Sequence, residues 1–276
     1  MQRRFVSSYD RWIQGQKSDL TKLLRAAAAP DATETELRSI IEQCMKLYED
    51  YSEQRKLLAR EDGPTFFSPP WCTSFENSVL WMGGCRPTLG IRLLYSLTGC
   101  EMEAHLEEFL RGQRGPTNVG MMALSASQLR LVNDIHQRTL RAEDWLSSRL
   151  ATLHEDLADK PLLPIIRELQ QMRRESTSSS SDAVASSSSN PPLVDGPGSC
   201  DDARKSEESA AAMQTYADRL AKLMEEADAL RLATARTLVT EVLNPRQAVE
   251  LLITAKELHL SLHTWGVERD HQHGRG

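Results

Sequence analysis

The spacing of apolar residues constrains this chain more than any other feature, because they recur at intervals of three and four along almost its entire length. Such spacing gathers apolar side chains on one face of an α-helix, whereas a half-buried strand requires strict alternation. No segment shows a convincing alternation. The sequence therefore predicts an all-α fold, a multi-helix bundle of long and short helices.

Capping and breaking residues predict where the first helices begin and end. A first helix is expected over residues 5–28, because Pro30 disfavours helical backbone in the residue before it. Thr33 and Glu36 have the spacing of a capping box. They predict the start of a second helix, which is expected to end near Gly63.

A third helix is expected after Pro70, with Val79 on its apolar side, and it is expected to stop at the adjacent glycines Gly83 and Gly84. Pro87 then suits the first turn of the next helix. The glycines lack the spacing of a dinucleotide-binding or phosphate-binding loop, and no Lys-Ser/Thr pair follows them. We therefore interpret this stretch as a structural corner between two helices.

The helical pattern continues through the second half of the chain. A short acidic helix is expected over residues 102–110, and Ser125 with Gln128 predicts the cap of a further long helix. Another helix is expected over residues 207–242, and a final one begins at Pro245.

A serine-rich tract interrupts this pattern. Between residues 176 and 199 the chain has ten serines and three prolines and almost no large apolar residue, so we predict a disordered insertion over residues 175–206. Compact folds rarely need a long structureless connection. We therefore expect a single helical domain over residues 5–266 with the tract as a surface insertion, followed by a disordered tail at 267–276.

Charge and cysteine content disfavour several functional classes. The net charge is −6 and the basic residues are interspersed with acidic ones, so direct DNA binding is not expected. The five cysteines form no Cys-x-x-Cys pair, and their odd number suits a reducing compartment. No apolar segment is long enough to cross a membrane, and the first residues lack the apolar core of a signal peptide. We expect a protein of the nucleus and cytoplasm.

Three segments carry a resemblance to a known family. They are "YDRWIQGQKSDLTKLLRA" near the start, "FENSVLWMGGCRPTLGIRLL" in the centre and "LNPRQAVELLITAKELHLSLHTWG" near the end. The chain resembles the plant Delay of Germination (DOG) domain family, which also includes the C-terminal domain of TGA-type bZIP transcription factors. The central segment is the most specific, and its signature residues are Trp81, Gly83, Gly84, Arg86 and Pro87.

The resemblance implies a regulatory and interaction protein without enzymatic activity. The first predicted helix begins within ten residues of the start, so we expect the basic region and zipper of TGA factors to be absent. Stand-alone relatives are linked to seed dormancy and abscisic-acid signalling, including binding of type 2C phosphatases. The alternatives that the resemblance leaves open are a co-regulator that partners bZIP factors, self-association, and a role in pollen development.

His259 and His263 are the candidate cofactor site. They lie four residues apart on one side of the last predicted helix. The resemblance implies haem binding by histidines in this region. Two axial ligands of one iron lie on opposite faces of the ring, so one helix should not supply both. Either one histidine is axial, or the pair binds a small metal in cis, or both are half-exposed helix residues without a ligand.

Tyr9 and Trp12 are the candidate partner-binding residues, because aromatic side chains concentrate interface energy and the opening helix of the family is implicated in association. Their alternative role is to seal the core of the bundle, which we favour for Trp12. Arg86 is expected to bond the carbonyls that end the third helix or to pair with a carboxylate. No catalytic set and no resident metal site are expected from the sequence.

Overall fold

The computed structural model describes residues 2–110, 122–163 and 199–274, together with 166, 167, 170 and 174. Every regular element among these residues is a helix, apart from an isolated bridge between Trp81 and Gly84, which confirms the all-α prediction. The chain forms two compact units, one of residues 1–147 with 221–276 and one of residues 148–220. Segments before and after the serine-rich tract thus share the first unit. The tract itself lies outside the described residues.

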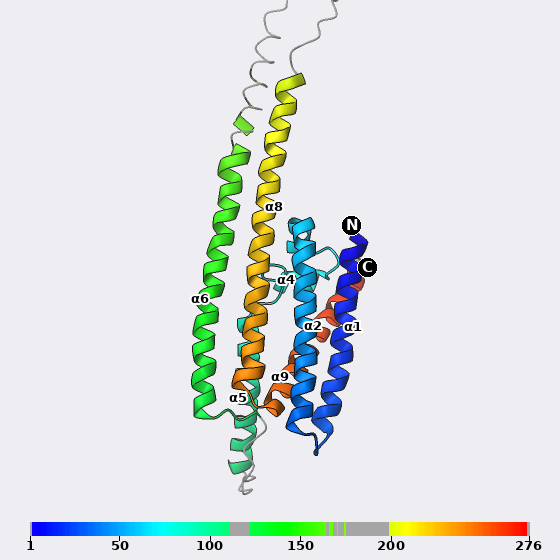
Figure 1. The fold of residues 1–276 in the computed structure, drawn as a ribbon, viewed down its shortest axis with the longest axis vertical. Coiled ribbons are helices and arrows are strands. Elements are labelled where there is room, and N and C mark those ends of the chain that lie inside the picture. The colour runs from blue at the N-terminus through cyan, green and yellow to red at the C-terminus, as the bar shows by residue number, and fades with distance from the viewer. Residues whose placement is uncertain are drawn as a thin grey trace, which may run out of the picture. The chain divides into compact units, whose positions relative to one another are not determined.

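Helices α1 (Gln2–Ala28) and α2 (Glu34–Glu61) form an antiparallel pair (Figure 1). The predicted capping box at the start of α2 is confirmed, because the backbone nitrogen of Thr33 donates to Glu36 at 2.8 Å and the backbone nitrogen of Glu36 donates to the Thr33 hydroxyl at 3.3 Å. Both helices bury one apolar stripe in the first unit, as their periodicity predicts.

The next segment corrects the prediction of a third helix running from Pro70 to the glycines. A short helix, α3 (Gly63–Phe67), comes first, and α4 (Ser74–Val79) begins only after Thr73. Thr73 caps α4 in a second capping box with Glu76. The helix ends because Leu80 adopts an extended backbone, so Val79 is 48% exposed and does not face the core.

The adjacent glycines form a tight turn. The backbone nitrogen of Trp81 donates to the Gly84 carbonyl at 2.7 Å, and the reverse bond is 3.2 Å long. Met82 and Gly83, which lie between Trp81 and Gly84, have φ of 49° and 68°. Positive φ at both central positions is typical of the tightest hairpin turns, and a side chain at Gly83 would strain this backbone.

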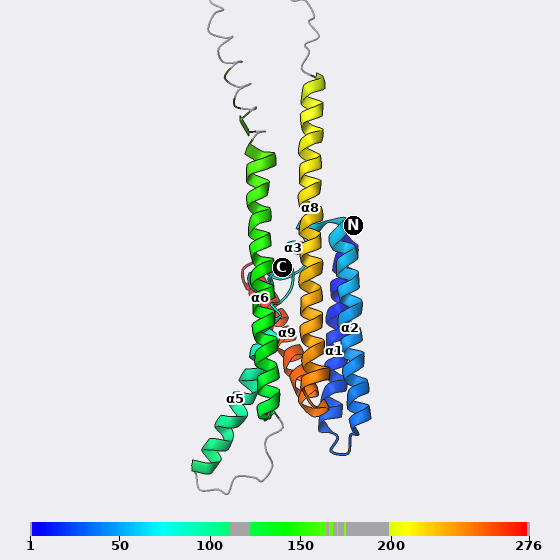
Figure 2. The same ribbon diagram turned by 60° about the vertical axis from the view of Figure 1, so that its left-hand side comes forward.

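Helix α5 (Thr88–Leu110) follows the turn as one continuous helix, so the prediction of a separate acidic helix over residues 102–110 is wrong (Figure 2). Its start is capped from another helix. The carboxylate of Glu143, which is fully buried, accepts from the Thr88 backbone nitrogen at 2.7 Å and from the Thr88 hydroxyl at 3.1 Å. A distant side chain thus satisfies an otherwise unpaired donor of the first turn.

Helix α6 (Ala126–Leu157) has the predicted cap, because the backbone nitrogen of Gln128 donates to the Ser125 hydroxyl at 3.2 Å. A π-helical turn, η1 (Ala158–Leu162), follows it. In the second unit the end of α6 lies beside the start of α8 (Ser199–Arg236). There Asp156 pairs with Arg219 at 3.6 Å.

The chain closes with a π-helical turn, η2 (Thr237–Val242), and helix α9 (Pro245–Gln272). Pro245 occupies the first turn of α9, as predicted, and the structure shows that Asn244 caps this helix. The tail that was predicted to be disordered from residue 267 is helical as far as Gln272. Leu258 and Trp265, in the second half of this helix, are 46% and 57% exposed.

Helix α9 organises the core of the first unit, because it contacts α1, α2, α4 and α5. Its first half is apolar and buried, and its second half faces α1 and α4 with polar residues. None of the described helices combines the length and apolar character needed to span a bilayer. The largest apolar cluster includes Leu23, Ile41, Met45, Ile91, Leu94, Val132, Leu238 and Leu252.

Candidate functional site

The residues singled out on the first and last helices lie in contact. The Tyr9 hydroxyl donates to Glu76 Oε1 at 2.5 Å, and Nδ1 of His263 lies 3.0 Å from the same oxygen. The two rings meet edge to face with their centres 5.9 Å apart. One carboxylate therefore joins α1, α4 and α9.

Burial and hydrogen bonding set the protonation states of this cluster. Burial raises the pKa of Tyr9 well above its usual range, and the charges of Cys72 and Glu76 add to the effect. Burial alone would raise the pKa of Glu76, but the hydrogen bonds from Tyr9, Thr73 and His263 lower it. Because Glu76 is ionised, the ring nitrogen that faces it carries the proton, so His263 donates to Glu76 through Nδ1.

Trp12 and His259 lie one turn further along the same two helices. Their ring centres are 6.1 Å apart, and Trp12 also stacks on Tyr51 at 4.2 Å. Nδ1 of His259 is buried and has no hydrogen-bond partner in the described part of the chain. Burial lowers the pKa of His259 to about 4, so the ring is neutral at physiological pH.

A buried lysine completes this line of polar residues. Lys256 is fully buried, donates to Gln16 Oε1 at 2.8 Å, and lies 3.6 Å from Asp19 Oδ2. Its ammonium group also lies 4.9 Å from the centre of the Tyr48 ring. Burial lowers the pKa of Lys256, while Cys44 and Asp19 oppose that shift. We call Tyr9, Trp12, Gln16, Asp19, Glu76, Lys256, His259 and His263 the α1–α9 polar line.

The backbone of α9 approaches α4 closely next to this line. A Cβ atom on Gly266 would lie 2.1 Å from the Thr73 hydroxyl oxygen, which caps α4. One turn later, Asp270 accepts a hydrogen bond from the Ser74 backbone nitrogen at 2.9 Å. The short helix that carries Glu76 is thus held against α9 from two positions.

A second polar cluster holds the Trp81–Gly84 turn. Arg231 of α8 donates to the Cys85 carbonyl at 2.6 Å, to the Met82 carbonyl at 3.2 Å and to the Trp81 carbonyl. The same guanidinium pairs with Asp228, which also accepts from Arg55 Nε at 2.8 Å. Burial opposes the charge of Arg55, but the ion pair with Asp228 raises its pKa.

The signature residue Arg86 has a different role from Arg231. Its guanidinium lies 3.9 Å from the buried carboxylate of Glu143 and 5.7 Å from the centre of the Trp81 ring. Of the two roles expected from the sequence, the structure places Arg86 near a carboxylate, and Arg231 covers the carbonyls. Trp81 in turn donates through its indole nitrogen to the Ser147 hydroxyl at 3.0 Å.

The surface between α1 and α2 is hollowed on the side of α1 away from Tyr9 and Trp12. A groove of about 460 Å³ runs between the start of α1 and the end of α2. We call it the arginine groove; its lining includes Arg3, Arg4 and Arg11 of α1 and Gln54, Leu57 and Leu58 of α2. Tyr9 and Trp12 lie on the opposite side of α1 and are only 7% and 9% exposed. A partner that meets α1 in this conformation therefore meets the groove and not those two rings.

Comparison with known proteins places this architecture in a family. A family model named DOG1 and described as seed dormancy control matches residues 19–96. Protein DOG1-like 3 of Arabidopsis thaliana is 32% identical over 96% of this chain and 84% of its own length. The chain belongs to the DOG1 family.

Other relatives show how far the DOG1 similarity extends. Protein RESPONSE TO ABA AND SALT 1 of Arabidopsis thaliana is 24% identical, and the alignment covers 96% of both chains. Transcription factor TGA2.1 of rice is 28% identical over 56% of this chain and 39% of its own length. The DOG1 family is regulatory, and about half of this chain is similar in sequence to part of a TGA-type bZIP transcription factor.

The two histidines of this DOG1 chain have different surroundings. His263 has its Nδ1 fixed by a carboxylate, the arrangement that usually orients a metal-binding histidine and leaves Nε2 for the metal. His259 instead packs against Trp12, and it lies on the same helix one turn away. No group of three or more His, Cys, Asp or Glu side chains suited to a metal ion occurs among the described residues.

Sequence reasoning missed several residues of these clusters. Glu76 was detectable, because Thr73-x-x-Glu76 has the capping-box spacing. Lys256 was assigned no role, although it precedes His259 by three positions and so shares its side of α9. Asp228 and Arg231 lie three positions apart on α8 and pair with each other, but their contacts with Arg55 and the Cys85 carbonyl span more than 140 positions and left no local signal.

Proposed function

We propose that this protein is a non-enzymatic regulator of seed dormancy and abscisic-acid responses that acts in the nucleus and cytoplasm by binding signalling proteins. The observation that carries the proposal is the 32% identity to Protein DOG1-like 3 across 96% of the chain. The full-length similarity to Protein RESPONSE TO ABA AND SALT 1 supports the link to abscisic acid. A type 2C phosphatase is the first partner to test.

Affinity capture from plant nuclear and cytoplasmic extracts, with quantitative mass spectrometry, tests this proposal. We expect a type 2C phosphatase among the enriched proteins, and we expect purified phosphatase to bind the purified chain directly. Trp12→Ala is a control variant that opens the contact with α9. It should weaken capture because less of the protein is folded, and circular dichroism would detect that loss. Recovery of bZIP factors without any phosphatase would contradict the proposal.

A second candidate function is co-regulation with bZIP factors. The 155-residue similarity to TGA2.1 favours it, because it links this chain to a transcription factor. Co-purification of this chain with the C-terminal domain of a TGA-type factor would support it. Size-exclusion chromatography that shows only separate species at micromolar concentration would count against it.

Haem binding is a third candidate, favoured by the carboxylate behind His263. Titration with haemin should then give a Soret band that is lost in His263→Ala and retained in His259→Phe. The second variant is a matched control, because it keeps a ring against Trp12. A Soret band unaffected by His263→Ala would exclude this residue as the ligand.

A further inference from the structure

We infer that the arginine groove binds an acidic peptide segment with an apolar side chain at its centre. The inference rests on the proposed interaction role and names the chemistry of the partner. Arg3, Arg4 and Arg11 line the groove, and no acidic side chain of the described residues does. Arg4 forms an ion pair at 3.0 Å with Glu61, a residue that does not line the groove. Arg3 and Arg11 form no ion pair with any described residue, so both are available to an anionic partner.

The two available arginines lie on one side of α1. Arg3 and Arg11 are eight residues apart, with Ser7 midway, so at 1.5 Å per residue their Cα atoms are separated by about 12 Å. An extended peptide covers that distance in about four residues. Two acidic residues four positions apart therefore match the two guanidinium groups.

The floor between the arginines is apolar. Leu57 of α2 is 59% exposed and lies beside the buried Leu58. Covering such an exposed leucine with an apolar group of a partner removes apolar surface from water and so stabilises the complex. A peptide side chain midway between the two acidic residues would lie over this floor.

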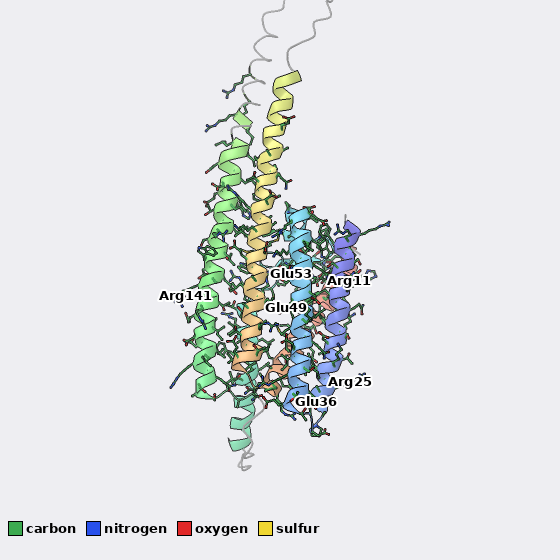
Figure 3. The ribbon with its side chains drawn as sticks, in the orientation of Figure 1. Arg11, Arg25, Glu36, Glu49, Glu53 and Arg141 are labelled. Carbon is green, nitrogen blue, oxygen red and sulfur yellow. The ribbon has the colours of Figure 1, made fainter. Side chains whose placement is uncertain are left out.

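Side-chain contacts fix the position of α1 against α2 at the groove. The Ser8 hydroxyl donates to Gln54 at 2.9 Å and ties α1 to α2 within the lining. Phe5 and Tyr9, on the far side of α1, anchor the same helix turns in the core. Figure 3 labels Arg11 on the upper part of α1 and Arg25 near its lower end, which makes Arg25 a matched control outside the groove.

An acidic peptide fits these features better than a nucleic acid or a lipid surface. The chain carries a net charge of −6, which repels a polyanion outside the groove. Two available arginines over a leucine floor suit a short segment with few charges. A duplex or a charged bilayer instead requires a broad basic face.

Fluorescence anisotropy with the purified full chain tests the inference. The probe is a fluorescein-labelled peptide with glutamates four positions apart and leucine midway, and control peptides replace the glutamates by glutamine or the leucine by serine. We expect the double variant Arg3→Gln/Arg11→Gln to weaken binding at least tenfold and Leu57→Ser at least threefold. Arg25→Gln should change it less than twofold.

Charge reversal gives the sharpest readout. Arg3→Glu/Arg11→Glu should lose the acidic peptide and bind the same peptide with lysines in place of the glutamates. Equal binding by wild type and Arg3→Gln/Arg11→Gln would overturn the inference, as would an equal loss in Arg25→Gln. Tighter binding of a single-stranded oligonucleotide, or of vesicles with anionic lipid, would overturn the choice of a peptide.

The peptide assay contains no phosphatase. Failure of phosphatase capture therefore leaves the result for the groove intact, and failure of the peptide leaves the wider interaction role intact.

Discussion

Gly266→Ala tests the contact between α4 and α9 most directly. The new methyl group would lie 2.1 Å from the Thr73 hydroxyl oxygen and 2.8 Å from the Thr73 Cβ atom. Both distances are far below van der Waals contact, and Thr73 is itself buried. Either the Thr73 side chain must leave its capping position, or α4 must move away from α9.

The expected cost follows from three terms. Overpacking a buried contact costs about 1–3 kcal/mol. Loss of the Thr73 cap adds about 1 kcal/mol. The better helix propensity of alanine recovers about 0.5–1 kcal/mol. We therefore expect Gly266→Ala to lower the free energy of unfolding by about 1–3 kcal/mol.

Urea unfolding followed by circular dichroism at 222 nm measures this effect. Gly90→Ala is the matched control, because its new methyl group would have no atom of the described residues within 4 Å and α5 should gain stability. In a Thr73→Gly background, glycine still serves as a helix cap. In that background, the loss of unfolding free energy caused by Gly266→Ala should be smaller than in the wild-type background by at least about 1 kcal/mol. A Gly266→Ala protein as stable as wild type would refute the described packing.

Three further predictions concern other positions. Gly83→Ala should destabilise by about 1–2 kcal/mol, because φ is positive, and Gly274→Ala, with similar φ at the chain end, should change the urea midpoint little. Asp228→Asn should cost about 3–5 kcal/mol in the same assay, because the buried Arg55 and the partly buried Arg231 lose their carboxylate. His259 has a folded pKa of about 4, below its unfolded value, so the unfolded state binds the proton first. Stability should fall by up to about 3 kcal/mol from pH 6.5 to 4. His259→Phe should flatten that slope, and an equal slope in both proteins would contradict the assignment.

The bundle itself was predictable because helix formation is local. Thr33 with Glu36, Ser125 with Gln128, and Asn244 ahead of Pro245 satisfy backbone donors within a few residues, so their effect is visible in the sequence. The prediction of the third helix was wrong for a non-local reason. Its residues near Val79 unwind into a turn that is stabilised by Arg231 from a helix far along the chain.

The candidate site shows the same division. The sequence indicated Tyr9, Trp12, His259 and His263 as two separate pairs, because each pair lies on one face of its own helix. Only the folded chain shows that the pairs touch and that Glu76 links them. It also shows that both aromatic rings are buried, which periodicity cannot distinguish from exposure to a partner.

The amino-acid sequence alone determined the helical class, the long helices with many of their ends, and the family, since caps, periodicity and signature segments are all local patterns. Tertiary structure decided which polar groups meet. Lys256 bonds to Gln16 of α1, and Arg231 bonds to carbonyls of the Trp81–Cys85 turn, and only packing these distant segments into one unit brings them within hydrogen-bond distance. The arginine groove has the same origin, because it forms only where the start of α1 lies beside the end of α2.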